Sequence, residues 1–579
     1  MFVKLPKNNF ANIKIDFNKE QKDYDIFENE NTIVFVYGYP YSVNSDNWVG
    51  AEDVFNLYLN EKLDFTDQID GLYSIIIIDK TQNKSYIITD RYGVYSFFYY
   101  KCEDYFLISD NIQKIITSLG SAELNYESII EYLNFGYRIG NKTHIKGIFQ
   151  FEGAQKYKVD INLIEKKQTY WNLLELAESN KISNEKFREI FNSYHQKALN
   201  ISDKVSLPFT GGRDTRTILS TYLNNAGGLD KIKTYTHGPR YHSDVVLAKK
   251  ATSKLKLSHN FYDLDEEWFK NLVSKVASNK EDFNGLNVFF DYIHTFESIE
   301  KEENNADVFL SGVLGNQLYR NHPIGNRAPN SMDIGNISEF IVNNIPSVLN
   351  FKTDLSNYYN KLFKNVSIDE INGQIKKSIR KELLKANGAE KAIDYVQYFL
   401  FSAYGANVAS NSLKVIGKHF KVIGSFFHKD LLQQIKFMGI NERTNASLQE
   451  FIIEQNSDYL GKLPYYNTGR IVKYLKLLTN KLSNAIIKKP LFPDPNLVNY
   501  PNSLRKHHKD FLLETLSYDK MKLKELFNEK ELNKLINLFI ENKSSFKNKK
   551  TFLFNFSLDK FIINLISLEL WLQSIKEIK

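Results

Sequence analysis

Residues 205–219 read Val-Ser-Leu-Pro-Phe-Thr-Gly-Gly-Arg-Asp-Thr-Arg-Thr-Ile-Leu. The apolar start is typical of a buried strand, the glycine pair favours a sharp turn, and a helix is expected to begin near Asp214. Backbone N–H groups at such a strand–loop–helix junction can bind an anion, with the Thr210 and Thr215 hydroxyls as further donors. Asp214 is placed to hold a cation beside bound phosphates. The stretch therefore predicts an anion-binding loop, although it lacks the GxxxxGK sequence of a Walker A loop.

Two further apolar segments end in small or hydroxyl-bearing residues. Residues 232–238 end in Thr236-His237-Gly238, and residues 308–312 end in Ser311-Gly312. Helical patterns separate these segments, and helices that alternate with short buried strands predict a parallel sheet. Because ligands bind at the carboxyl ends of strands in such sheets, we expect the three strand ends to converge on one crevice.

The two ends of the chain have different patterns. The first ~160 residues are rich in Val, Ile, Tyr and Phe and predict strands, whereas the chain beyond about residue 335 is mostly helical in pattern. The expected strands of the first part are residues 32–37, 73–78, 85–89, 96–100 and 105–109, with a helix at residues 126–135.

Composition limits the classes of function. The 579 residues, 42% apolar and with 75 Lys+Arg against 68 Asp+Glu, indicate two or more globular domains. A net charge of +7 without any long basic tract does not indicate nucleic-acid binding. The start of the chain lacks the apolar region of an export signal, and no segment has the composition of a membrane span. The single cysteine, Cys102, excludes a disulfide framework and favours a reducing compartment, so we expect a cytoplasmic protein.

Taken together, these motifs resemble those of asparagine synthetases over nearly the whole chain. Thr210-Gly-Gly-Arg-Asp-Thr215 is similar to the family's pyrophosphate loop, Ser-Gly-Gly-x-Asp-Ser, with Thr at both hydroxyl positions. Other matching segments of the synthetase part are Thr236-His237-Gly238, Ser243-Asp244, Ser311-Gly312 and Leu568-Glu-Leu-Trp571. The glutaminase part is matched by Asp70-Gly-Leu-Tyr-Ser74, Thr89-Asp-Arg-Tyr-Gly93, Ile108-Ser109 and Glu131-Tyr-Leu-Asn-Phe-Gly136.

The resemblance implies a fold of mixed α/β and α+β class with two domains. Residues 1–165 would form a glutaminase-like αββα sandwich of the Ntn-hydrolase type, and residues 166–185 a linker. Residues 186–579 would form an α/β domain of the ATP-pyrophosphatase type, with a parallel sheet and a mostly helical extension.

The resemblance also implies ATP and Mg²⁺ as cofactors, and an activity that adenylates a carboxylate for attack by an amine. On this interpretation Asp214, Thr215 and Arg213 are catalytic, and Asp214 and Asn316 hold the metal. The nucleotide and its pyrophosphate would contact Phe209, Thr210, Gly211, Gly212, Thr236, His237, Gly238, Ser311 and Gly312.

The glutaminase part departs from the family pattern. Glutamine-hydrolysing members need a cysteine at position 2, whose thiolate attacks the glutamine amide. Here position 2 is Phe2, and Cys102 is expected in a hairpin far along the chain. The segments that should hold glutamine are also altered, to Tyr37-Gly38-Tyr39 and Gly50-Ala51-Glu52. We therefore predict an inactive glutaminase domain.

The synthetase part departs as well. Where the family has an acidic pair that helps to bind Mg²⁺, this chain has Asn316 and Gln317, and neutral ligands bind Mg²⁺ less tightly than carboxylates. Lys421 and Ile423 stand at the acidic and arginine positions of the acceptor region. The substrate is therefore not expected to be plain aspartate.

Three interpretations stay open on the sequence. The first is an AMP-forming ligase without its own glutaminase, as in the related β-lactam synthetases and lasso-peptide cyclases. It would join a small-molecule or peptide carboxylate to ammonia or another amine. The second is a pseudoenzyme that retains nucleotide binding, and the third is an ammonia-dependent asparagine synthetase. The expected partners include neither nucleic acid nor membrane, and the oligomeric state, a homodimer included, is open.

Overall fold

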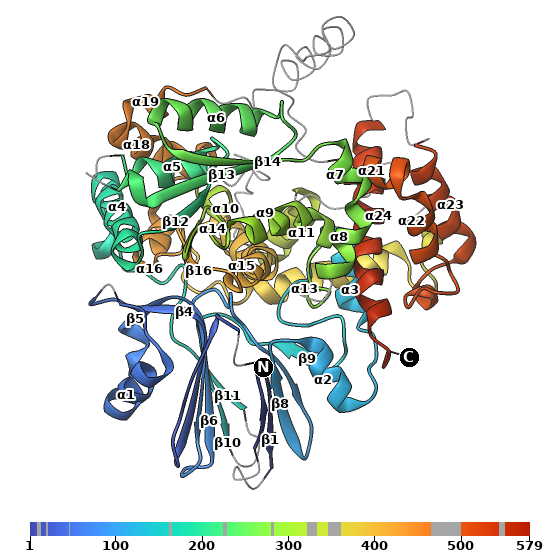
Figure 1. Cartoon of the computed structure of the whole chain (residues 1–579). Coiled ribbons are helices and arrows are strands. Elements are labelled where there is room, and N and C mark those ends of the chain that lie inside the picture. Colours follow the sequence, from blue (N-terminus) through green and yellow to red (C-terminus); the bar gives the residue numbers. More distant parts are fainter. Residues whose placement is uncertain are drawn as a thin grey trace, which may run out of the picture.

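A computed structural model describes residues 1–7, 13–18, 21–45, 47–160, 165–223, 228–279, 283–320, 333–344, 360–464, 499–542 and 551–578. The N-terminal part is built on two stacked sheets, and the remainder on a parallel sheet flanked by helices (Figure 1). The prediction of a mixed α/β fold with a parallel sheet and a helical C-terminal region is thus confirmed.

Every strand pairing in the N-terminal sandwich is antiparallel. The first sheet has the order β2 (Lys14–Asp16), β1 (Phe2–Pro6), β8 (Tyr105–Ser109), β7 (Phe98–Lys101) and β9 (Ile148–Gln150). The second has the order β11 (Glu165–Thr169), β10 (Gln155–Asp160), β6 (Lys84–Thr89), β5 (Ile69–Asp79), β4 (Thr32–Ser42) and β3 (Tyr24–Glu28).

Helices cover the outer faces of this sandwich. Helix α1 (Ala51–Glu61) packs on β3 and β4, and α2 (Ile112–Leu119) packs on β7 and β8. Because successive strand residues point to opposite faces, Ile75 and Ile77 of β5 pack beneath α1, whereas Ile76 and Ile78 belong to the core between the sheets. The layers are therefore helix, sheet, sheet and helix.

Most of the expected elements of this region are present. Residues 105–109 form β8 and residues 126–135 form α3 (Tyr126–Phe135), both with the predicted ends. Cys102 lies in the hairpin between β7 and β8, as expected. Strand β7 begins at residue 98 rather than 96, and the Ser96 hydroxyl before it donates to the carbonyl oxygen of Phe151 at 2.5 Å. Strand β11 occupies the start of the range assigned to a linker.

The second half contains a five-stranded sheet in which every pair is parallel. Its order is β14 (Ser258–Asp263), β13 (Ile232–Gly238), β12 (Val205–Pro208), β15 (Val308–Ser311) and β16 (Lys421–Gly424). The helices nearest the strands include α4 (Asn184–Ile201), α5 (Arg213–Ser220), α6 (Ser243–Leu255) and α9 (Ile293–Glu302). Strand β12, which leads into the glycine loop, lies at the centre of the sheet.

The rest of this half is helical. Its helices of ten or more residues are α11 (Ile334–Asn344), α13 (Ile368–Leu383), the π-helix η7 (Leu400–Ala409), α18 (Ser447–Asn456), α23 (Glu529–Ile540) and α24 (Thr551–Ser574). The shorter helices are η3 (Glu178–Asn180), η4 (Leu229–Lys231), α7 (Glu266–Lys270), α8 (Leu272–Asn279), η5 (Phe289–Asp291), α10 (Gly315–Tyr319), α14 (Ala392–Phe399), α15 (Ser410–Gly417), α16 (Lys429–Leu432), η8 (Gln433–Phe437), α17 (Ile440–Asn445), α19 (Asp458–Gly461), α21 (Tyr500–His507), α22 (Lys509–Thr515) and η9 (Lys524–Leu526). The N-terminal half has one further short helix, η2 (Asp64–Asp67), among its described residues. Among the helices of the described residues, none combines the length and the apolar character needed to cross a bilayer.

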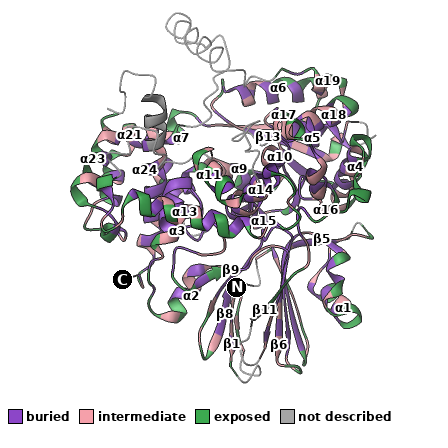
Figure 2. Ribbon diagram, turned by 180° about the vertical axis from the view of Figure 1, so that it is seen from behind, coloured by how far each residue is buried: buried purple, intermediate pink, exposed green. Residues whose placement is uncertain are grey.

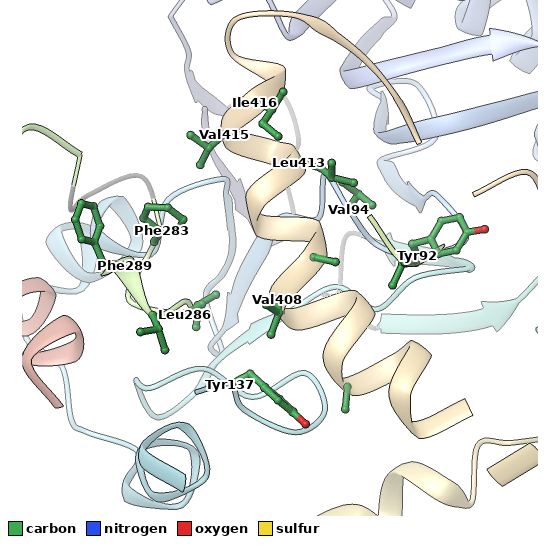
Figure 3. Close-up of a cluster of buried hydrophobic side chains, with 14 of the residues drawn as sticks. Tyr92, Val94, Tyr137, Phe283, Leu286, Phe289, Val408, Leu413, Val415 and Ile416 are labelled. Carbon is green, nitrogen blue, oxygen red and sulfur yellow. The ribbon is translucent and has the colours of Figure 1, made fainter. Parts of the chain in front are cut away.

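One continuous helical segment, residues 392–417, joins the two halves. Figure 3 shows Val408 and Leu413 of this segment between Tyr92 and Val94 on one side and Phe283 on the other. Hydrogen bonds reinforce the apolar packing, since the Tyr39 hydroxyl donates to the carbonyl oxygen of Gly417 at 2.7 Å. Buried residues run from the sandwich strands into the helices above them, so the halves share one core (Figure 2).

Asp23 lies just before β3, and its carboxyl group is buried in this core. Its side chain is 1% exposed, and its carboxyl oxygens accept no hydrogen bond from the described residues. Burial raises the pKa of Asp23 to about 6. The folded protein therefore favours the neutral form of the Asp23 carboxyl group. The stability that this preference contributes is fully present below pH ~4 and is lost as the pH rises through about 6.

We expect Asp23→Asn to remove this pH dependence. Asn resembles the neutral acid, so the variant and the wild type should be equally stable near pH 4, with the variant more stable by about 3 kcal/mol near pH 8. Urea unfolding at both pH values measures the difference. A difference in stability that does not change with pH would contradict the assignment.

Candidate active site

The ends of three neighbouring strands meet beside the glycine loop. Strand β12 pairs with β13 on one side and with β15 on the other. The Thr236 hydroxyl, near the end of β13, donates to the carbonyl oxygen of Phe209 at 2.5 Å. On the other side, a Cβ atom built on Gly312 would lie 3.4 Å from Cβ of Asp214. The structure therefore brings the predicted residues of all three segments to one edge of the sheet.

The loop takes a tight turn that depends on Gly211. This residue has a φ of +69°, in the left-handed region that favours glycine, and a Cβ built on it would lie 2.8 Å from Cβ of Leu247. The Thr210 hydroxyl accepts a hydrogen bond from the nitrogen of Gly212 at 3.2 Å and lies 3.5 Å from the Thr215 hydroxyl. Both hydroxyls thus lie at the start of α5, where helical N–H groups lack partners within the helix.

We expect Gly211→Ala to strain the loop. The variant should lose ~1–3 kcal/mol of stability, because Ala disfavours the left-handed conformation and its methyl group would contact Leu247. Gly373→Ala in α13 is a matched control, since a Cβ there meets no atom within 4 Å, and it should be neutral or stabilising by up to ~1 kcal/mol. Thermal unfolding of both variants measures the difference. An equal effect at the two positions would show that the turn does not require glycine.

Asp214 is the carboxylate at the start of α5. Its Oδ1 accepts a hydrogen bond from Nε2 of Gln449 at 2.6 Å, and a Cβ built on Gly315 would lie 2.6 Å from the same oxygen. Burial raises the pKa of Asp214, while the bond from Gln449 and the charges of Arg320 and Arg213 oppose that rise. The close approach of Gly315 leaves the Asp214 carboxylate facing the loop between β15 and α10.

Two arginines on α5 have different surroundings. Arg213, predicted to be catalytic, forms an ion pair with Glu450 of α18 at 2.8 Å. Arg216 is fully buried, and its guanidinium donates to the carbonyl oxygens of Gly211 at 2.7 Å, Leu463 at 2.7 Å, Pro464 at 2.8 Å and Leu460 at 3.3 Å. Neither Arg216 nor Gln449 was predicted from the sequence. Gln449 lies 235 residues from Asp214, and three of the four carbonyl oxygens that Arg216 contacts lie more than 240 residues away, so no local pattern marks them.

The predicted nucleotide residues of β13 lie beside a histidine pair. Nδ1 of His237 lies 3.0 Å from the Ser298 hydroxyl, and its ring centre lies 4.7 Å from that of His294. Burial lowers the pKa of His237 to about 4, with a smaller contribution from His242, so the imidazole is neutral near pH 7. Gly238 follows with a φ of +146°. A neutral, polar wall of this kind suits a nucleobase better than a phosphate.

The predicted metal ligands are Asp214 and Asn316. The Asn316 Oδ1 atom accepts a hydrogen bond from Nε of Arg320 at 2.7 Å, so a cation already contacts this oxygen. Within the part of the chain that the structure describes, no cluster of three or more His, Cys, Asp and Glu side chains could hold a metal ion. Hydroxyl and N–H groups lie on one side of the loop, and a single carboxylate lies on the other. This set of groups fits the phosphates of a nucleotide, with a metal ion held mainly by the phosphates themselves.

A small pocket near the start of β1 is lined by residues of both halves. Phe2 pairs with Ser109 of β8, and a cavity of about 130 Å³ lies nearby, lined in part by Tyr37, Asp110 and Lys414. Cys102 lies beyond the other end of β8, which is about 13 Å long at ~3.3 Å per residue. No thiol is therefore near position 2.

Comparison with known proteins gives one match to a domain family and several matches to whole proteins. Residues 36–171 match the family model of the glutamine amidotransferase domain. Two proteins of Methanocaldococcus jannaschii, provisionally named asparagine synthetase (glutamine-hydrolyzing) 2 and 1, are 23% identical over 293 residues and 22% identical over 283 residues. Each match covers 48% of this chain, with 55% of the first protein and 48% of the second.

A third relative, asparagine synthetase (glutamine-hydrolyzing) 2 of Bacillus subtilis, is 22% identical over 183 residues, or 29% of this chain and 24% of that protein. Among solved structures, glutamine phosphoribosylpyrophosphate amidotransferase of B. subtilis matches with a TM-score of 0.19 and 9% identity, over 44% of this chain and 76% of that one. A TM-score this low assigns no fold. The chain spans about half the length of the two archaeal relatives. The chain is thus similar to asparagine synthetases, with a glutamine amidotransferase-type domain at residues 36–171.

Proposed function

We propose that this protein is an AMP-forming ligase that adenylates a carboxylate and joins it to an amine, without hydrolysing glutamine itself. The main observation behind the proposal is that three strand ends meet at the glycine loop. Asp214 lies beside Gly312 there, and the Phe209 carbonyl oxygen accepts a hydrogen bond from Thr236. Ligands of open parallel sheets bind at such an edge. The similarity to asparagine synthetases supports the same reaction class.

The reaction would have two steps at this edge. An oxygen of the substrate carboxylate attacks the α-phosphorus of ATP, which forms an acyl adenylate and releases pyrophosphate. The amine nitrogen then attacks the acyl carbon, loses a proton and displaces AMP. Since both steps move negative charge onto phosphate oxygens, the donors that matter are fixed ones: the N–H groups of the loop and the hydroxyls of Thr210 and Thr215.

Asp214 is the residue that would hold Mg²⁺ in this protein. When bound, the ion would offset the charge of the phosphates. Asn316 would contribute only its remaining lone pair, because Arg320 already donates to its Oδ1. Arg320 and Arg213 lie close enough to oppose the rise in the pKa of Asp214, and they add positive charge on the same side.

The side chains at the expected glutamine site of the N-terminal domain support a loss of glutaminase activity. Tyr37 and Tyr39 replace the family's glutamine-binding segment, and both are buried against Tyr95, with ring centres 4.8 Å and 6.1 Å from it. Phe2 stands where the nucleophile should be, and Cys102 lies at the far end of β8. The domain then serves as a structural base, tied to the synthetase half by the bond from Tyr39 to Gly417.

A nucleotide-binding pseudoenzyme is the second candidate. One argument for it is that the Arg320 guanidinium contacts Asn316, a residue expected to bind the metal ion. Another is that Lys421 stands at an acidic position of the family pattern. Ammonia-dependent asparagine synthesis is the third, and it would need aspartate as the carboxylate. We place the reaction in the cytoplasm, with a homodimer as the alternative to a monomer.

Release of pyrophosphate from ATP tests the proposal. The purified chain is incubated with Mg²⁺-ATP, a panel of small-molecule and peptide carboxylates, and either ammonium or glutamine. The ligase predicts carboxylate-dependent pyrophosphate release, with amide formed from ammonium or another amine and none from glutamine alone. ATP binding without pyrophosphate release from any carboxylate would favour the pseudoenzyme, and product from glutamine alone would contradict the loss of glutaminase activity.

A further inference from the structure

Arg320, directly after α10, is a half-buried cation close to Asp214. Helix α10 begins at Gly315, where a Cβ would lie 2.6 Å from Oδ1 of Asp214. The same helix packs on α18, whose Gln449 donates to that oxygen. Arg320 thus follows a short helix that lies against the carboxylate expected to bind Mg²⁺, although Arg320 belongs to none of the predicted motifs.

The Arg320 guanidinium has a neutral partner. Its Nε donates to Oδ1 of Asn316 at 2.7 Å, and its two terminal nitrogens have no hydrogen-bond partner among the described residues. No carboxylate of those residues forms an ion pair with Arg320. Charged side chains that are withdrawn from water are normally paired, because removing a charge from water is costly. The terminal N–H groups of Arg320 are therefore suited to an anionic ligand.

Two charged side chains, Asp214 and Arg213, act on Arg320. Burial lowers the pKa of the Arg320 guanidinium, Asp214 opposes that fall, and Arg213 adds to it. Arg213 is already paired with Glu450 at 2.8 Å. Asp214 is thus the carboxylate that offsets the charge of Arg320, from beyond ion-pair distance. When Asp214 holds Mg²⁺, its charge is offset by the ion, and the guanidinium lacks an anion.

Asn316 is the residue that leaves this charge available. The family pattern has an acidic residue here, and a carboxylate at position 316 would form an ion pair with Arg320. The Asn amide accepts the same hydrogen bond and orients the guanidinium without neutralising it. Guanidinium groups bind phosphate oxygens through two parallel N–H donors. Together, Asn316 and Arg320 provide an oriented cation for a phosphate group.

We propose that Arg320 binds the pyrophosphate part of ATP and supplies the positive charge that a metal ion held by an acidic pair would otherwise supply. Arg320 and an ion at Asp214 would then share the charge of the phosphates. On this view the neutral side chains of Asn316 and Gln317 are compatible with an active ligase. The inference rests on the proposed function, which names ATP as the ligand, but its test measures binding of inorganic pyrophosphate and needs no catalysis.

Calorimetric titration of the full chain with inorganic pyrophosphate tests the role of Arg320, once with excess EDTA and once with Mg²⁺. We expect the wild type to bind pyrophosphate without metal, within about tenfold of its affinity with Mg²⁺. Arg320→Gln should weaken the metal-free binding at least ~tenfold, the value of one charge-assisted hydrogen bond. Arg320→Lys retains the charge but not the fork of donors, so it should lose less than Arg320→Gln.

Asn316→Asp leaves Arg320 in place and pairs it with a carboxylate. This variant should also weaken metal-free binding at least ~tenfold, and its binding should depend more strongly on Mg²⁺, because the new carboxylate can hold the ion together with Asp214. Arg380→Gln is the matched control. Arg380 is exposed on α13, so the loss of its charge should leave pyrophosphate binding unchanged.

Absence of pyrophosphate binding without metal overturns the proposal. So does metal-free binding that Arg320→Gln and Asn316→Asp both leave unchanged. If the wild type nevertheless releases pyrophosphate from ATP in the presence of a carboxylate, the ligase assignment stands without this role of Arg320. Binding that Arg320→Gln weakens, in a chain that releases no pyrophosphate with any carboxylate, would instead support Arg320 as a phosphate-binding residue and contradict the ligase.

Discussion

Asp214→Asn is expected to reduce carboxylate-dependent pyrophosphate release by about 10²–10³-fold, the size of effect seen when one charge-stabilising group is removed from an active site. Asp214 is the carboxylate that the structure places at the start of α5, against Gly315 and beside the strand ends. Asn retains the oxygen that accepts from Gln449, so the local fold should survive. What the variant loses is the negative charge that would hold a metal ion beside phosphates.

Asp265→Asn serves as the control for this substitution. Asp265 caps the start of α7 by accepting from the nitrogen of Trp268 at 2.9 Å, and Asn caps helices equally well. Both variants should unfold at the wild-type temperature, and only Asp214→Asn should lose activity. Full activity in Asp214→Asn would mean that the phosphates bind elsewhere.

The local sequence was sufficient to predict the framework of this site. The apolar run into Gly211-Gly212 and the segments ending in Gly238 and Ser311 have the lengths and residue types of strands, and the structure pairs all three in parallel. Strand β14 was not predicted, because its sequence Ser-His-Asn-Phe-Tyr-Asp has no apolar run or alternation. Strand β16, Lys-Val-Ile-Gly, was not predicted, because its apolar run is only two residues long.

The side-chain partners of the predicted metal ligands could not be predicted in the same way. Whether Asn316 is free to bind a metal depends on Arg320, four residues ahead on a short helix whose start the sequence does not mark. The contact of Gln449 with Asp214 joins residues 235 positions apart. The contact of Gln449 forms only when α18 packs on α5, so it depends on tertiary structure and leaves no periodic signal.

Arg216→Met is expected to be the most destabilising single change near the glycine loop. The Arg216 guanidinium is fully buried and donates to four backbone carbonyl oxygens, one of them in the loop at Gly211 and three at residues 460–464. Met fills a similar volume but donates nothing, and each carbonyl oxygen left without its donor costs ~1–3 kcal/mol. A total loss of roughly 3 kcal/mol or more should follow. Lys should not rescue the fold, because one ammonium cannot reproduce the planar fork of donors.

Arg213→Met on the same helix separates this effect from a simple loss of charge. The ion pair of Arg213 with Glu450 is partly exposed, with 23% and 37% of the two side chains accessible, so breaking it should cost only ~0.2–1 kcal/mol. Urea unfolding of Arg216→Met, Arg216→Lys and Arg213→Met measures all three. If Arg216→Met were no less stable than Arg213→Met, Arg216 would not be what holds the loop. The expected order instead assigns the shape of the glycine loop to a residue outside the predicted motif, which anchors Gly211 through its carbonyl oxygen.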